Sequence, residues 1–219
     1  MPDAANKKKH KITLIGDSHA RGCSEKLANF LGSSYNVIGI SKPNADLKAI
    51  TSTINMRLEN LMKKVLVIIW GKTRDIAKNE SNVGLKQPMQ FAKSTCDTNV
   101  IVMSAPLRFD LQPFSCVNKE VAVFNRKLLK LMTIFNHLQT CNISLNTIHY
   151  NTCRLHMNNL GKDLITNMWA RKIKDLFLAT SSKPAISLPL KQDIVTSEME
   201  ENCYLAIVNS DFITRHNWY

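Results

Sequence analysis

The chain has 219 residues, of which 44% are hydrophobic and 21% are charged, and its formal net charge is +12. This length is typical of one domain, and the longest apolar run, Val65 to Trp70, is too short to span a membrane. The excess of Lys and Arg attracts polyanions, so a nucleic acid or another polyanion is one candidate partner.

Short apolar segments alternate with longer amphipathic segments along the chain. The apolar segments predict strands at Lys11–Gly16, Tyr35–Ile40, Lys64–Trp70, Asn99–Ser104 and Cys141–Leu145. The amphipathic segments predict helices at Cys23–Leu31, Ala45–Leu61, Val83–Thr95, Val117–His137 and Leu160–Leu178. This alternation predicts an α/β fold, a three-layer αβα sandwich around a five-stranded parallel sheet.

The predicted elements fill residues 11–179, which we expect to form one domain. Residues 1–10 form a basic N-terminal arm. After Ala179 the composition changes to Ser, Pro and acidic residues, which predicts a poorly ordered tail over residues 180–219. Within it, the apolar run Tyr204–Val208 is a candidate edge strand.

The N-terminus and the cysteines indicate where the protein works. The apolar stretch behind the basic arm stops at Gly16, which is too short for a signal peptide. The six Cys residues are scattered without paired spacing, as in proteins whose thiols stay reduced. We therefore expect an intracellular protein, cytoplasmic or nuclear.

One group of side chains of the types that bind metals lies close together in the sequence, namely Cys141, His149, Cys153 and His156. Its spacing matches no familiar zinc pattern. We therefore expect neither a metal nor another cofactor.

Asp17 and Ser18 follow the first predicted strand directly, in the segment ITLIGDSHARG. Ligands gather at the carboxyl ends of the strands in such a sheet, so a hydroxyl there is well placed for a nucleophile. The free N–H groups of the predicted helix after Ser18 would stabilise negative charge beside it. The alternative is that Asp17 and Ser18 only cap that helix.

His156 is the best candidate for the base that a serine nucleophile needs. It lies in RLHMNNLGKDL, after the last predicted strand and before a long amphipathic helix, and therefore at the same end of the sheet. The alternative is an ordinary histidine in a surface loop.

Taken together, these segments resemble the SGNH, or GDSL-like, hydrolase superfamily. GDSHARG at 16–22 is similar to the block that carries the family's serine nucleophile, and LHMNNLGK at 155–162 to the block with its histidine base. VIGISKPNA at 37–45 is similar to the second block, where Gly39 matches the glycine that serves the oxyanion hole. The resemblance implies the flavodoxin-like SGNH fold. It also implies Ser18 and His156 as catalytic residues.

A closer resemblance concerns the segments MSAPLRFDL and SCVNKEVAVFNRKL. They look like SGNH-type domains in insect genomes, many of them derived from retrotransposon open reading frames. This resemblance implies a transposon origin for the chain.

The third and last blocks depart from the family pattern. In VIIWGKTRDI, Arg74 occupies the position of the oxyanion-hole asparagine, and Asp75 follows it. A guanidinium can donate hydrogen bonds to an oxyanion, but its length puts the geometry in doubt. Cys153 occupies the position of the aspartate that orients the histidine, and the motif places neither Asp75 nor Asp163 to replace it. In the second block, Asn44 stands where related domains tend to have glycine.

Two functions follow from these observations. The first is a serine esterase that hydrolyses a small acyl ester with a Ser18–His156 dyad, with Gly39 and Arg74 at the oxyanion and Asp17 and Asp75 as supporting residues. The second is a catalytically inactive domain of transposon origin that binds a polyanion such as nucleic acid. The sequence leaves the acyl substrate and the oligomeric state open.

Overall fold

The computed structural model describes residues 10–57, 65–71, 76, 81–95, 98–135, 137–142 and 144–181. Its centre is a five-stranded sheet with the order β2-β1-β3-β4-β5, in which every neighbouring pair is parallel. The strands are β1 (His10–Gly16), β2 (Tyr35–Ser41), β3 (Val65–Trp70), β4 (Asn99–Met103) and β5 (Leu138–Cys141). The predicted five-stranded parallel sheet is confirmed.

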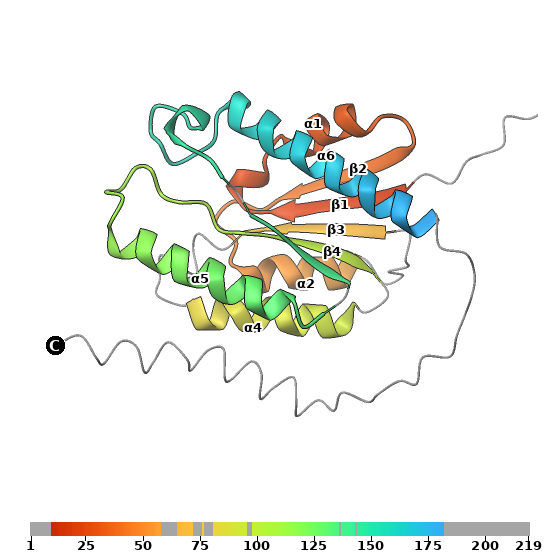
Figure 1. Cartoon of the computed structure of the whole chain (residues 1–219), viewed down its shortest axis with the longest axis horizontal. Coiled ribbons are helices and arrows are strands. Elements are labelled where there is room, and N and C mark those ends of the chain that lie inside the picture. The colour runs from red at the N-terminus through yellow and green to blue at the C-terminus, as the bar shows by residue number, and fades with distance from the viewer. Residues whose placement is uncertain are drawn as a thin grey trace, which may run out of the picture.

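Helices cover both faces of the sheet (Figure 1). One face carries α1 (Cys23–Leu31) and α6 (Asn159–Ser181), and the other carries α2 (Leu47–Arg57), α4 (Ser81–Ser94) and α5 (Cys116–Met132). The predicted three-layer sandwich is therefore confirmed. Because side chains alternate between the faces of a strand, β3 supplies apolar residues to both layers.

Each layer has its own apolar core. Under α1 and α6, the indoles of Trp70 and Trp169 meet edge to face, with their ring centroids 5.4 Å apart. Under α2, α4 and α5, Phe124 is completely buried against the opposite face of the sheet. These two cores fix the sheet between its helices and so fix the strand ends that carry the candidate site.

Two predicted boundaries near the end of the sheet are wrong. The last strand spans Leu138–Cys141 and not Cys141–Leu145. The preceding helix, predicted to reach His137, ends at Met132, because Thr133 and Ile134 form a turn that leads into β5. Phe135 still packs into the same core after the helix has ended, so the apolar pattern continued past the true boundary.

The other elements agree closely with the prediction, and α1 has the predicted bounds. Helix α2 begins at Leu47, two residues later than predicted, and the Asp46 carboxylate accepts a hydrogen bond from the Ala49 N–H in its first turn. Several predictions lie outside the described residues: the arm up to residue 9, the end of the second helix at 58–61, and the tail from residue 182 with its candidate strand Tyr204–Val208.

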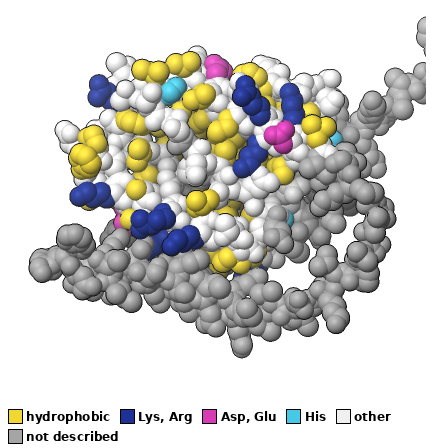
Figure 2. Space-filling view, viewed as in Figure 1, with side chains coloured by type: hydrophobic (Ala, Val, Ile, Leu, Met, Phe, Trp, Pro, Cys, Tyr) yellow, Lys and Arg dark blue, Asp and Glu magenta, His cyan; other side chains and the backbone are white. Residues whose placement is uncertain are grey.

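The described surface carries its cations in several separate groups on the face drawn in Figure 2. Across the described ranges, no helix is both long and apolar enough to cross a membrane.

Candidate active site

The turn after β1 brings Ser18 to the carboxyl end of the sheet. The Asp17 N–H donates a hydrogen bond to the Trp70 carbonyl of β3 (2.9 Å), which ties this turn to the neighbouring strand. Gly16 permits the contact, because a Cβ at this position would overlap the Trp70 carbonyl and approach the Ala20 methyl group to 2.8 Å. Strand order reverses between β1 and β3, and ligands in this type of sheet bind at such a reversal.

Ser18 begins a short 3-10 helix, η1 (Ser18–Ala20), and Asp17 is its N-cap. Helix α1 begins only at Cys23, after Gly22 in a left-handed conformation (φ 73°). The predicted start of α1 at Cys23 is therefore correct, and η1 lies between this helix and β1. The predicted capping role holds for Asp17, whose carboxylate accepts a hydrogen bond from the His19 N–H (2.9 Å).

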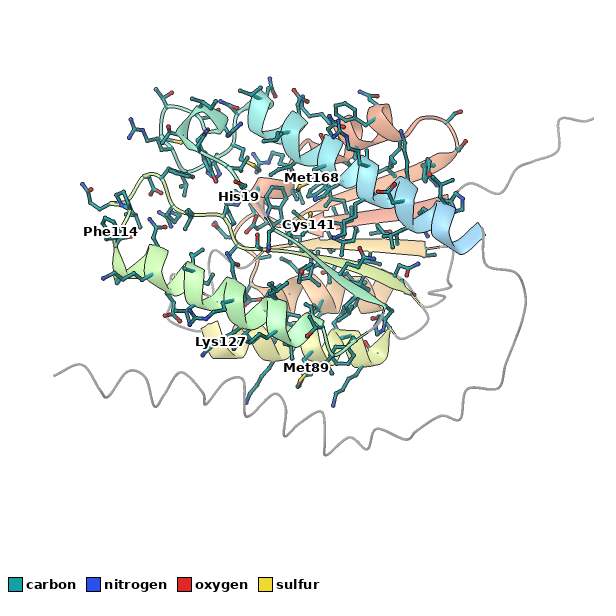
Figure 3. All side chains as sticks on the ribbon, viewed as in Figure 1. His19, Met89, Phe114, Lys127, Cys141 and Met168 are labelled. Atoms are coloured by element: carbon teal, nitrogen blue, oxygen red, sulfur yellow. The ribbon has the colours of Figure 1, made fainter. Side chains whose placement is uncertain are left out.

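The Asp17 carboxylate also holds the His19 ring, with 3.0 Å between Oδ1 and Nδ1. Both side chains are buried, and the His19 ring lies beside Trp70 with centroids 5.9 Å apart. Figure 3 shows His19 at the end of the sheet where β1 leads into η1. His19 lies in the same motif as Ser18, but the motif alone did not predict this buried contact.

His156 lies in a compact loop between η2 (Thr147–His149) and α6. Tyr150 and Met157 pair as an antiparallel bridge across the base of this loop, and the Asn151 N–H donates a hydrogen bond to the His156 carbonyl (2.8 Å). The Asn158 amide donates two further hydrogen bonds, to the Ile148 carbonyl of η2 and to the Tyr150 carbonyl at the start of the loop. The main chain that carries the His156 ring is therefore held on both sides.

A cavity of about 400 Å³ brings the two predicted catalytic residues together. The described residues that line it are Ser18, His19, Arg21, Pro43, Asn44, Asn151, His156, Met157 and Lys162. The His156 and His19 rings have centroids 5.8 Å apart. Ser18 and His156 line the same cavity, but no hydrogen bond joins their side chains.

The pKa of His156 is lowered from its ordinary value of 6.5, first by partial desolvation and then by the neighbouring His19. The cations Arg21 and Lys162 lower this pKa further, and the Asp17 carboxylate opposes them. The lowered pKa favours the neutral imidazole, which is the form that accepts a proton.

Gly39 does not reach the cavity. It lies within β2 opposite Leu14, two residues before the strand ends, and a Cβ there would overlap Ser24 of α1. Pro43 and Asn44, in the loop after β2, line the cavity instead, and Asn44 has a left-handed backbone (φ 59°) of the kind that favours glycine.

Two predicted site residues and the cysteine at the position of the family's aspartate are not among the described residues that line the cavity. Arg74 and Asp75 lie outside the described residues. Cys153 is exposed, and hydrogen bonds from the Leu155 and His156 N–H groups lower the pKa of its thiol. Its sulfur is therefore engaged with the main chain of its own loop.

Among the residues that the structure describes, no three His, Cys, Asp or Glu side chains lie close enough to hold a metal ion. Three cavity residues with ionisable side chains were not predicted from the sequence: His19, Arg21 and Lys162. All three lie inside the two blocks that carry Ser18 and His156, but the blocks do not show which of their side chains reach the cavity.

Several solved structures share the fold, and their descriptions include lipolytic proteins, acylhydrolases and a peptidoglycan O-acetyltransferase from Streptococcus pneumoniae. A member of the lipolytic G-D-S-L family from Veillonella parvula has 13% identity and a TM-score of 0.63, with 74% of this chain and 97% of that chain covered. A proposed acylhydrolase from Bacteroides fragilis has 19% identity and a TM-score of 0.62, covering 80% and 90%. A lipase from a goat rumen metagenome has 15% identity and a TM-score of 0.59, covering 77% and 97%.

At these identities the comparisons establish the fold, which is that of the GDSL hydrolases. No protein-family model and no curated protein matches the sequence. The transposon origin and the intracellular location stay predictions.

Proposed function

We propose that this protein hydrolyses a small ester, with Ser18 as the nucleophile and His156 as the general base. The observation that carries the proposal is the shared cavity at the carboxyl end of the sheet, which Ser18 and His156 both line. A fold shared with GDSL lipolytic proteins and acylhydrolases supports the same reaction class.

In the proposed reaction, the Ser18 hydroxyl attacks the ester carbonyl while His156 accepts the hydroxyl proton. The tetrahedral intermediate collapses to an acyl-serine as His156 returns that proton to the departing alcohol. Water then attacks the acyl-serine with His156 again as base, and the acid product leaves with Ser18 restored. The lowered pKa of His156 favours the neutral ring that the first step of this reaction needs.

The developing oxyanion needs hydrogen-bond donors. The Ser18 N–H makes no hydrogen bond with another described residue, and Asn44 lines the same cavity. We assign the oxyanion to these two residues in place of Gly39. Loss of one such donor typically lowers the rate about 100 to 1,000-fold.

The loop that carries His156 must orient its ring, because Cys153 occupies the position of the aspartate that would otherwise do so. The bridge between Tyr150 and Met157 and the hydrogen bond from Asn151 fix the main chain. On the cavity side, the buried pair of Asp17 and His19 borders the His156 ring. We infer that this pair positions the ring, while Asp17 partly offsets the nearby positive charges.

The test is hydrolysis of p-nitrophenyl acetate by the wild type, Ser18→Ala and His156→Gln. Ser144→Ala is the matched control, because Ser144 is an exposed serine outside the cavity. We expect both site variants to lose at least about 1,000-fold in kcat/KM and the control to match the wild type. Equal rates for the wild type and Ser18→Ala would refute the proposal.

A second candidate is a non-catalytic domain that binds a polyanion. The net charge of +12 and the lack of a carboxylate at position 153 favour this candidate. On the face drawn in Figure 2, the described cations lie in separate groups and form no continuous patch. Titration of a labelled oligonucleotide at two salt concentrations separates the candidates, since phosphate contacts weaken steeply with salt. No binding at low salt would remove this second candidate.

A further inference from the structure

The candidate cavity is positively charged. Its described lining contains Arg21 and Lys162 but no Asp or Glu side chain, and its other polar groups are neutral amides, a hydroxyl and two imidazoles. Asp17 lies behind His19 and is engaged by that ring. A ligand in this cavity therefore meets cations with no anionic side chain in the described wall.

Both cations lack an ionic partner among the described residues, whereas other cations of the described surface form ion pairs. Lys26 forms an ion pair with Asp163 at 2.6 Å, and Arg108 forms a bidentate ion pair with Asp110. Neither Arg21 nor Lys162 makes such a pair within the described ranges. The carboxylate nearest to Lys162 in sequence, Asp163, is thus already committed to Lys26.

The two cations come from different elements and converge on the cavity. Arg21 lies between η1 and α1, and Lys162 lies in the first turn of α6. The Lys162 ammonium reaches back toward Gly22, where it would lie 3.8 Å from an added Cβ. The charges of both cations reach His156, so an anion held by them would lie next to the proposed base.

We propose that the cavity selects an ester that carries a second, anionic group, such as a carboxylate, which Arg21 and Lys162 bind. The reaction on that ester rests on the proposed hydrolase function, whereas the selection of the anion is a property of the cavity. The anionic group neutralises the two cations, and the ester group then lies toward Ser18 and His156.

A binding measurement on a variant without the nucleophile tests whether the cavity prefers the anionic ester, because no ester is hydrolysed during the titration. Ser18→Ala is titrated by calorimetry with 4-acetoxybenzoate and with its neutral counterpart, methyl 4-acetoxybenzoate. We expect the anionic ester to bind about 10-fold more tightly, and Lys162→Gln or Arg21→Gln in the same background to reduce that preference about 5-fold each. Arg171→Gln is the control, because it removes a cation from the exposed side of α6 outside the cavity.

Hydrolysis of the two esters by the protein with Ser18 intact is measured in parallel as acetate release. Tighter binding of the anionic ester that depends on both cations supports the inference, whether or not turnover occurs. Equal or weaker binding of the anionic ester, or a preference unchanged in Lys162→Gln and Arg21→Gln, overturns it. Absence of Ser18-dependent turnover of either ester refutes the hydrolase function alone.

Discussion

The Asp17 carboxylate holds the His19 imidazole at 3.0 Å in a buried pair directly behind the candidate cavity. Asp17 also caps η1 through the His19 N–H, so one carboxylate fixes both the main chain and the side chain of the same residue. Ser18 lies between these two residues in the sequence. Its position therefore depends on the pair even though it takes no part in it.

We expect Asp17→Asn to destabilise the protein by about 1 to 3 kcal/mol, because it weakens buried hydrogen bonds to a residue that cannot move into water. Urea unfolding followed by circular dichroism measures the change. His149→Asn serves as the comparison, since His149 lies in η2 and does not line the cavity. A midpoint for Asp17→Asn equal to that of the wild type would contradict the buried pair.

The pH dependence of ester hydrolysis should follow His156. The pKa of this group is lowered below 6.5, and the protonated ring cannot accept the Ser18 proton, so activity should be full at pH 7 and fall at more acidic pH. Removal of a cation that lowers this pKa, as in Lys162→Gln, should move the acid limb to higher pH. A wild-type midpoint above 6.5 would show that another group controls the rate.

The groups that act on His156 are His19, Asp17, Arg21 and Lys162. His156 in turn lowers the pKa of Asp110, whose main partner is Arg108. Titration of the His156 ring by NMR separates its own pKa from that of the reaction. The pKa of His156 should be higher in Arg21→Gln and lower in Asp17→Asn than in the wild type.

Cys153→Ser should leave kcat/KM within about twofold of the wild type, because the thiol is exposed and accepts hydrogen bonds from its own loop. Cys153→Asp should raise the pKa of His156, since it places a carboxylate three residues before the ring. Steady-state kinetics and the NMR titration of His156 measure the two effects. A loss of activity above tenfold in Cys153→Ser would show that the thiol has a role that we do not assign to it.

Gly16→Ala should destabilise the protein by about 2 to 3 kcal/mol, because the new methyl group overlaps the Trp70 carbonyl at the turn that carries Ser18. Gly32→Ala is the matched variant. Its φ of 83° disfavours alanine, but an added Cβ there meets no atom within 4 Å, so it should lower stability without changing kcat. Loss of kcat in both variants would show that the effect is not local to the Ser18 turn.

Much of the fold was predictable because the apolar residues in the sequence pattern are the residues that pack into the two cores. Strand β1 and helix α1 have strong apolar patterns that end at Gly16 and Gly32, and their predicted limits hold almost to the residue. Strand β5 was misplaced because this short edge strand, LQTC, is less apolar than the segment that follows it. Pattern alone cannot identify an edge strand that buries only its ends.

The candidate site was predictable only in part. Order along the chain places Ser18 and His156 at one end of the sheet, and the structure brings both to one cavity. A motif does not give the register of a strand, and the pairing of Gly39 with Leu14 places this residue before the strand end and outside the described lining of the cavity. His19 and Lys162 required the structure, since their roles depend on packing between η1, α1 and α6.

Covalent labelling of Ser18 tests the central claim most directly. The wild type, Ser18→Ala and His156→Gln are treated with a fluorophosphonate, and the labelled peptide is identified by mass spectrometry. The account predicts one adduct on Ser18 in the wild type, at least about 100-fold slower labelling in His156→Gln and none at this position in Ser18→Ala. An unlabelled wild type, or equal labelling rates in the wild type and His156→Gln, would contradict it.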